Sequence, residues 1–354
     1  MQSFAISASQ QFTQATIDSL TPLGNGLIND TFLIKTTDKA FVLQRINTEV
    51  FPEPSQIMEN LCLLNKHISH KPSIKLIIPK VLKTLDQQLY FIDKHNYFWR
   101  AIEFIADTES KEQINHQQQA EQVGFALAHF HSLLSDVDIT SFHDTLPGFH
   151  ITPSYFKHYQ SVDRHEEKQN SSSKINQCKE YIEAFIPKID ALEKAKQQGL
   201  LIERITHGDP KLNNFLFRKG SHKIISLIDL DTVKPGLVHY DIADCLRSCC
   251  HQETSNTFDL KLCKLILNSY LKEMAEVFTE YDYEFLFPAI ELIPFELGLR
   301  FYTDYLQGNQ YFKVDSAEQN LDRALAQFQL CENIGKQENK IRQLIIEIKH
   351  NIKY

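Results

Sequence analysis

The stretch HGDPKLNNFLFRKGSHKIISLID (residues 207–229) places five polar side chains within its first eight positions, directly before two short apolar runs. The runs, at 214–218 and 223–228, are joined by the turn KGSH and predict a hairpin of two strands. A carboxylate, Asp229, ends the second run. Polar groups at the edge of apolar strands cost free energy unless they are paired or bind something. The stretch therefore predicts a site beside a hairpin.

The three oxygen-bearing side chains of this stretch suggest what the site does. Asp229 would lie beside Asn214 if the two strands pair, and an amide oxygen with a carboxylate suits Mg²⁺, which takes its other ligands from phosphates and water. Asp209 is then free to accept a proton from an attacking hydroxyl. Lys211 could reach a transferred phosphate as a point charge. The spacing H-x-D-x-x-x-x-N with a later Asp is that of phosphoryl-transfer sites.

Composition sets the broad class of the protein. A chain of 354 residues is long for one hydrophobic core and suggests two lobes. The net charge of −8 argues against nucleic acid or an anionic membrane as the main partner. The seven cysteines show no CxxC spacing, and neither a signal peptide nor a run of about 20 apolar residues is visible. We expect a soluble, cytoplasmic protein with reduced thiols.

Hydrophobic periodicity divides the chain into a strand-rich part and a helical part. Five antiparallel strands are predicted before residue 106, at 31–36, 40–46, 75–84, 87–92 and 97–105, with a helix at 54–68 after the second. The later part predicts helices at 116–135, 240–250, 257–280, 284–306 and 316–350, and an irregular, exposed loop at 140–175. We expect an α+β fold with a sheet-rich N-terminal lobe (1–105) that holds one helix, and a larger, mainly helical lobe (106–354).

The catalytic-loop pattern HGDPKLNN followed by LID resembles the protein-kinase-like superfamily, and more closely its aminoglycoside phosphotransferase and choline kinase branch, which has Gly at the position of Gly208. Further segments look together like the bacterial N-acetylhexosamine 1-kinases and their relatives. These segments are GNGLINDTFLI (24–34), FVLQRINTEVF (41–51), MEN (58–60), WRAIEFI (99–105), LPGFHITP (146–153), IDLDTVKPG (228–236), YDIADCLR (240–247) and LRFYTDYLQGNQYF (299–312). The resemblance implies a two-lobed kinase fold with ATP and Mg²⁺ in the cleft.

The resemblance also implies which residues of the N-terminal lobe bind the nucleotide. Glycines let backbone amides approach phosphates, so the loop before the first strand is a candidate, although such a loop can be a simple turn. Glu59 resembles the glutamate that orients the phosphate-binding cation, and the end of the fifth strand matches the hinge that meets adenine through its backbone. The implied nucleotide contacts are Gly24, Asn25, Gly26, Asn29, Thr31, Glu59, Glu103 and Ile105.

The family places a lysine or arginine of this strand against the α- and β-phosphates, and the second predicted strand has no lysine for this role. Alignment puts Gln44 at this position, whereas charge favours Arg45. Alternation along a strand sends the two side chains to opposite faces, so only one can face the nucleotide. We favour Arg45 for the phosphate contact.

Acceptor contacts are implied at Asp209, Asp231, Arg300 and His150. Asp231 would hold a second metal ion or a sugar hydroxyl. The rigid donor fork of Arg300 suits hydroxyls or an N-acetyl carbonyl, but a surface ion pair with Glu296 is an equal alternative. Asp241 and Asp244, by contrast, are interpreted as structural.

The resulting hypothesis is an ATP-dependent small-molecule kinase. Its acceptor would be the anomeric hydroxyl of an N-acetylhexosamine or a related sugar. One alternative is a kinase of another hydroxyl compound, such as choline, homoserine or an aminoglycoside. Another is a nucleotide-binding protein without turnover, which only the missing lysine supports. The sequence leaves the acceptor and the oligomeric state open.

Overall fold

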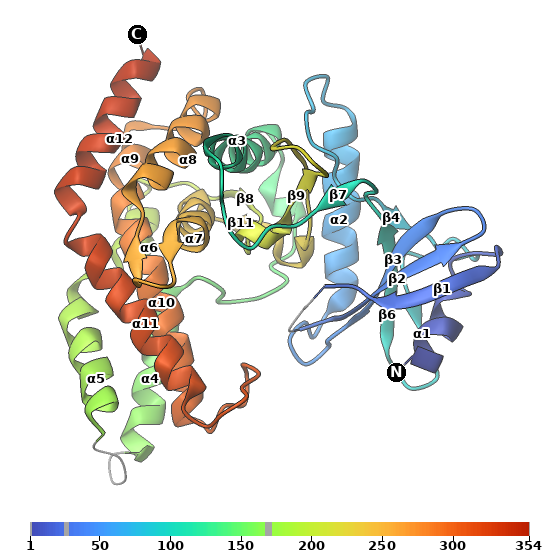
Figure 1. Cartoon of the computed structure of the whole chain (residues 1–354), viewed down its shortest axis with the longest axis horizontal. Helices are drawn as coiled ribbons and strands as arrows, with labels where there is room; N and C mark the ends of the chain where they lie inside the picture. Colours follow the sequence, from blue (N-terminus) through green and yellow to red (C-terminus); the bar gives the residue numbers. More distant parts are fainter. Residues whose placement is uncertain (1, 25–27, 167–171, 354) are drawn as a thin grey trace.

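An N-terminal sheet and a larger helical body form the two lobes of the protein (Figure 1). The computed structural model describes residues 2–24, 28–166 and 172–353. Helix α2 (Pro54–Ser69) stands where the two lobes meet, and the chain ends lie on opposite lobes (Figure 1). This is the α+β, two-lobed architecture that the sequence predicts.

The N-terminal lobe is built on one antiparallel sheet. Its strands run in the order β1 (Ile17–Pro22), β2 (Asp30–Thr36), β3 (Ala40–Ile46), β6 (Phe98–Glu103) and β4 (Val81–Leu82), with β5 (Phe91–Ile92) also paired to β6. The strand β1 and the helix α1 (Gln2–Ser9) were not predicted, because the polar segment IDSLTP carries no clear alternation of apolar residues. The helix α2 follows β3, as expected.

The alternation of side chains along β3 gives the sheet two different faces. Phe41 and Leu43 pack with Trp99 in a small core closed by α1. Ile46 and Phe98 belong instead to the large core that includes the apolar side of α2 and continues into the helical lobe. The second face is therefore the one that looks toward the rest of the molecule.

Ten helices form most of the second lobe within the described ranges. They are α3 (Gln117–Leu133), α4 (Thr152–Glu166), α5 (Ser173–Phe185), α6 (Ala191–Gln197), α7 (Val238–Cys250), α8 (Leu260–Glu273), α9 (Glu280–Glu284), α10 (Leu286–Leu306), α11 (Gln319–Gly335) and α12 (Glu338–Lys353). No helix among the residues placed by the structure is both long and apolar enough for a membrane span.

Two expectations about this lobe were wrong. The segment predicted as an irregular loop contains α4, which carries Pro153 in its first turn, where proline is tolerated, and buries Tyr159. The helix expected over 316–350 is divided into α11 and α12 around Gly335. The helical spacing of apolar residues, on which the prediction rested, did not reveal the break between these two helices.

Short strand pairs position the segment that contains the catalytic-loop pattern. The predicted hairpin is present as β9 (Phe215–Arg218) and β10 (Ile224–Leu227), and β7 (Thr108–Glu109) extends it. A second pair, β8 (Arg204–Thr206) with β11 (Lys234–Gly236), closes the base of the segment. The two ends of the segment 207–233 are therefore held side by side by this strand pair.

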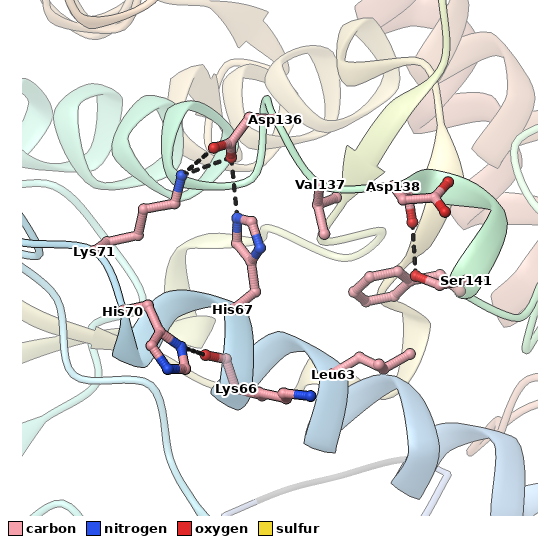
Figure 2. A pocket seen from close by; sticks show the side chains of 10 residues that line it. Leu63, Lys66, His67, His70, Lys71, Asp136, Val137, Asp138 and Ser141 are labelled. Carbon is pink, nitrogen blue, oxygen red and sulfur yellow. Dashed lines mark hydrogen bonds and ion pairs between the residues drawn. The ribbon is translucent and has the colours of Figure 1, made fainter.

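A cavity of about 490 Å³ opens beside α2, away from this segment (Figure 2). Its walls come from α2 and from residues 136–142 after α3. Asp136 accepts a hydrogen bond from Lys71 Nζ at 2.6 Å and lies 3.0 Å from His67 Nε2. None of the predicted site residues lines this cavity, so it is separate from the site described next.

Candidate active site

The buried carboxylate of Asp241, on α7, holds the backbone at the start of the catalytic loop. It accepts hydrogen bonds from the amides of His207 at 2.6 Å and Gly208 at 2.9 Å, and it lies 2.8 Å from His131 Nε2. Burial alone would raise the pKa of Asp241, but the His131 hydrogen bond and charge hold it below its usual value. The structural interpretation of Asp241 is confirmed.

Gly208 is required by both its conformation and its surroundings. Its φ of +87° lies in the left-handed region, and an added Cβ would stand 2.7 Å from Thr232 Cβ and from the Thr232 carbonyl oxygen. The Thr232 hydroxyl donates to the His207 carbonyl at 2.8 Å. The beginning and the end of the segment 207–233 therefore touch at Gly208, where there is no room for a side chain.

Asp209 follows this glycine, at the edge of the lobe. Lys211 Nζ donates to its Oδ2 at 2.6 Å, and Asn214 Nδ2 donates to its backbone oxygen at 2.7 Å. Loss of surrounding water raises the pKa of Asp209, although the Lys211 ammonium opposes the shift. A raised pKa makes a carboxylate a better proton acceptor, as the predicted base requires.

Asp229 leaves β10 in the left-handed conformation, with φ 64° and ψ 55°. The neighbouring Ile228 amide donates to the Asn214 carbonyl at 3.0 Å, which brings Asp229 next to Asn214. Loss of water raises the pKa of Asp229, and the Asp209 carboxylate adds to the shift. The structure thus gathers Asp209, Asn214 and Asp229 at one place.

The donor atoms of this group suit a hard divalent ion. The amide nitrogen of Asn214 is taken by Asp209, and no hydrogen bond between described residues occupies the Asn214 oxygen or the Asp229 carboxylate. Within the described ranges, no group of three or more His, Cys, Asp or Glu side chains could hold a metal by itself. One amide oxygen and one carboxylate, completed by phosphate and water, is the ligand supply that Mg²⁺ uses.

A row of polar side chains crosses the inner face of the sheet and reaches Asp231. Thr31 pairs with Gln44 across β2 and β3, and Gln44 pairs with Arg100 across β3 and β6. Gln44 Nε2 donates to Thr31 Oγ1 at 3.1 Å, and its Oε1 accepts from Arg100 Nε and Nη2 at 3.0 and 2.7 Å. Arg100 Nη2 also donates to Asp231 Oδ1, which joins the two lobes.

Sequence reasoning missed Arg100, although a signal was present. The residue is a single cation inside the apolar run YFWRAIEFI, and only 2% of its surface is exposed. A buried arginine is costly unless it is paired, so an isolated charge within such a strand indicates a specific partner. Here the partners are Gln44 and Asp231.

The preference for Arg45 as the phosphate contact is corrected by its position. Arg45 Nε donates to Asp30 Oδ2 at 2.7 Å, and its guanidinium lies 4.5 Å from the centre of the Tyr97 ring. It therefore faces away from the row that contains Gln44. Glu59 does not orient a sheet cation either, because its carboxylate is exposed and lies 2.7 Å from His143 Nε2.

Two other predicted nucleotide contacts, Asn29 and Thr31, belong to the same polar row. Gly24 has φ +71° with nothing within 4 Å of an added Cβ, whereas Asn25 and Gly26 lie outside the described residues. Asn29 donates to Asp231 Oδ2 at 2.7 Å. Thr31 faces Gln44, as described above.

The two predicted hinge residues, Glu103 and Ile105, lie at and just beyond the C-terminal end of β6. At the end of β6, the Glu103 amide donates to the Lys80 carbonyl at 2.8 Å, and the Ile105 carbonyl accepts from Thr108 Oγ1 at 2.7 Å. Their backbone therefore connects the sheet to the second lobe, where the resemblance places the hinge.

Asp231 is not placed to contact the acceptor. Its Oδ1 is bound by Arg100 and its Oδ2 by Asn29, and only 3% of the residue is exposed. The expectation that Asp231 binds a sugar hydroxyl or a second metal is therefore corrected, because both oxygens are already used.

His150 lies directly behind the catalytic loop. Its Nδ1 is 2.9 Å from Glu296 Oε1, and its Nε2 is 3.0 Å from the Gly208 carbonyl oxygen. Although burial lowers the pKa of His150, the Glu296 carboxylate raises it above its usual value. His150 thus supports the loop that carries Asp209.

Arg300, on α10, is surrounded by four aromatic rings. Its guanidinium carbon lies between 5.1 and 5.9 Å from the ring centres of Phe149, Tyr155, Tyr311 and Phe312. No ion pair within 4 Å joins Arg300 to Glu296 in the described part of the chain, since Glu296 is taken by His150 and by Thr152 at 2.6 Å. The alternative of a surface ion pair is therefore wrong.

Asp244, on α7, is an acidic side chain near both Asp209 and Arg300. It interacts electrostatically with each of them. It pairs with Arg247 at 2.7 Å, as its structural interpretation predicts. The Arg300 cage and Asp209 therefore lie within electrostatic reach of the same carboxylate.

Fold and site together define a kinase-like phosphotransferase. A family model described as the phosphotransferase enzyme family matches residues 19–272, and the chain belongs to this family.

Solved structures with the same fold span nearly the whole chain. A microcompartment-associated aminopropanol kinase has TM-score 0.69 at 14% identity, covering 96% of this chain and 98% of its own. An aminoglycoside phosphotransferase from Alicyclobacillus acidocaldarius has TM-score 0.64 at 15% identity, with coverages of 98% and 96%. An amicoumacin kinase solved with AMP-PNP and Ca²⁺ has TM-score 0.57 at 12% identity, with coverages of 96% and 93%. The protein is therefore a phosphotransferase.

Proposed function

We propose that the protein transfers the γ-phosphoryl group of ATP to the anomeric hydroxyl of an N-acetylhexosamine or a related neutral sugar, with Mg²⁺ as the metal ion. The observation that carries this proposal is the position of Arg300. A cation enclosed by four rings lies next to the catalytic loop, where the acceptor must bind.

The charge of this region favours a neutral acceptor. Aromatic rings can hold a ligand's ammonium group by cation–π attraction, but here the guanidinium of Arg300 already fills the cage. The neighbouring carboxylates are also paired, Asp244 with Arg247 and Glu296 with His150. An amine would meet an unpaired cation, whereas hydroxyls and an N-acetyl carbonyl would meet five donors in a rigid fork.

Each residue of the catalytic loop has a role in the proposed transfer. The acceptor oxygen forms a bond to the γ-phosphorus while the bond to the β-phosphate oxygen breaks, and ADP leaves. Asp209 accepts the proton of the acceptor hydroxyl and aligns it, and Lys211 offsets charge on the phosphoryl oxygens. Asn214 and Asp229 hold Mg²⁺, which neutralises charge on the phosphate oxygens when bound.

The nucleotide lies along the edge of the sheet in this proposal. Its phosphates meet the loop that begins at Gly24, and its adenine meets the backbone of Glu103 and Ile105. We also place the protein in the cytoplasm, where ATP is plentiful and thiols stay reduced. All seven cysteines are free, which supports this assignment.

The test is an ADP-release assay over a panel of neutral hexoses, N-acetylhexosamines, amino alcohols and aminoglycosides. Phosphorus NMR of the product then locates the new ester. We expect turnover on a neutral sugar and an anomeric phosphate in the product. Turnover confined to amines would contradict the acceptor assignment, and ATP binding without turnover on any compound would favour a non-catalytic protein.

A further inference from the structure

We infer that Arg100 contacts the nucleotide phosphates and supplies the cation that the Gln44 face of β3 lacks, with Asp231 as the acid that orients it. This inference rests on the proposed function, because it assumes that ATP binds between the lobes. The resemblance implied a phosphate-binding cation on β3 and an orienting acid on α2. In the inferred arrangement, the cation is on the neighbouring strand β6 and the acid is on the segment after β10.

The first support is an unused donor on Arg100. Nε and Nη2 bond to Gln44 and Asp231, but Nη1 is buried and has no hydrogen-bond partner. A guanidinium donor that is buried and unpaired is unfavourable, and Arg is the side chain that most readily forms paired hydrogen bonds to phosphate. The residue is thus held by its other nitrogens with one nitrogen left for a ligand.

The second support is the position of Arg100 relative to the metal ligands. Asp231 lies two residues after Asp229, and Arg100 Nη2 donates to Asp231 Oδ1, so the guanidinium is held beside the segment that carries the metal ligand. An ion between phosphates and Asp229 would place the phosphate oxygens in the field of Arg100.

The third support is that, among the described cations of β2, β3 and β6, only Arg100 pairs with Asp231. Arg45 faces Asp30 and Tyr97 on the opposite side of the sheet. Lys35 of β2 is four residues from Thr31 and shares its face, but it is exposed and pairs with Ala40 at the far end of β3, away from Gln44. Gln44 stands at the position of the expected lysine. Its side-chain oxygen accepts two hydrogen bonds from Arg100 and so holds the guanidinium beside this position.

The test compares nucleotide affinities by calorimetry with ATP, ADP and adenosine in the presence of Mg²⁺. Arg100→Met should bind ATP and ADP about 10- to 100-fold more weakly than wild type, the loss expected for hydrogen bonds to charged groups. Adenosine affinity should not change. Arg45→Met is the matched control and should bind all three ligands as wild type does.

The double variant Gln44→Lys with Arg100→Met returns the cation to β3 and should recover part of the lost ATP affinity. An Arg100→Met protein that binds ATP as wild type does, or that loses ATP and adenosine affinity equally, would overturn the inference. If this variant does not fold, Arg100→Lys decides: its ratio of ATP to adenosine affinity should fall, and an unchanged ratio would refute the phosphate contact. A wild-type protein that binds no ATP would instead refute the proposed function.

Discussion

At the scale of single residues, three positive φ angles surround the catalytic aspartate. Gly208 has φ +87°, Asp229 has φ 64° and His150 has φ 63°. For a residue other than glycine, this conformation costs on the order of 1 kcal/mol or more, and it persists where the surrounding contacts fix it. His150 is held by its contacts to Glu296 and to the Gly208 carbonyl, and Asp229 follows the Ile228–Asn214 hydrogen bond, so neighbouring contacts fix both residues.

Gly208→Ala tests how tightly the loop is packed. Its new Cβ would meet Thr232 at 2.7 Å, whereas Gly220, on the turn of the hairpin, has φ +68° and nothing within 4 Å of an added Cβ. Both substitutions share the cost of a left-handed alanine, but only Gly208→Ala adds a clash. We expect it to lower the free energy of unfolding by about 1–3 kcal/mol more than Gly220→Ala. Denaturant unfolding measures the difference, and equal losses would show that the loop can move aside.

The catalytic-loop residues could be predicted from the sequence, because their spacing is local. Asp209 and Asn214 are five residues apart, and a short hairpin returns the chain to Asp229. The cation of the sheet could not be predicted in the same way. Alternation shows that Gln44 and Arg45 face opposite sides, but the choice of side depends on α1 and on the pairing of β3 with β6.

At the scale of elements, α10 connects the acceptor region with the catalytic loop. Glu296 and Arg300 lie one turn apart on this helix. Glu296 reaches the Gly208 carbonyl through His150, while Arg300 enters the ring of aromatic side chains. A helix that is buried on nearly all sides is a rigid support, so these two contacts are fixed relative to each other.

Arg300→Lys keeps the charge but removes the planar donor fork. We expect the acceptor KM to rise about 10-fold or more while the ATP KM stays within about twofold of wild type. Arg342→Met is the matched control, since Arg342 also stands over a ring, that of Phe287, on the distant helix α12. Steady-state kinetics on the acceptor found in the panel measures both constants. A rise in the ATP KM alone would place Arg300 outside the acceptor region.

The His150 contact predicts a dependence of stability on pH. His150 faces Glu296, Asp244, the ring of Tyr240 and the Gly208 carbonyl. Its pKa is raised in the folded state, chiefly because Glu296 outweighs the effect of burial, so folding retains a proton that the unfolded chain releases at about pH 6.5. This stabilisation is complete below about pH 6.5 and is lost as the pH rises through the pKa of the folded state.

Denaturant unfolding of wild type and of His150→Gln from pH 5.5 to 9 tests this pH dependence. The measured quantity is the difference between their free energies of unfolding at each pH. The advantage of wild type should be largest at the acidic end and should shrink as the pH rises. An advantage that is constant or grows with pH would contradict the charged His150–Glu296 pair.

Elements with strong periodicity or a clear turn could be predicted, such as α3, α7, α10 and the hairpin. The elements that sequence reasoning missed depend on distant partners. β1 is a polar strand that forms because β2 offers an edge, and β8 forms only because β11 returns beside it. Neither partner can be recognised from the local sequence.

At the scale of the whole molecule, buried polar contacts join the two lobes near the candidate site. Asp231 binds Arg100 and Asn29 of the sheet lobe. Asn60, on α2, is 1% exposed and donates to the carbonyls of His143 and Val233, both at 2.9 Å. Breaking one partner of a buried pair is costly, so these contacts hold the lobes in register. The fold class was predictable because the two parts of the chain differ in periodicity, but these joints were not.

The central claim is that Asp209 acts as the base while Asp229 holds the metal ion, and paired variants separate the two roles. The measurement is the rate of acceptor phosphorylation together with ATP affinity with and without Mg²⁺. Asp209→Asn should lose about 10²- to 10⁴-fold in kcat and keep Mg²⁺-dependent ATP binding, whereas Asp229→Asn should lose both. An Asp209→Asn enzyme that turns over near the wild-type rate would contradict the account.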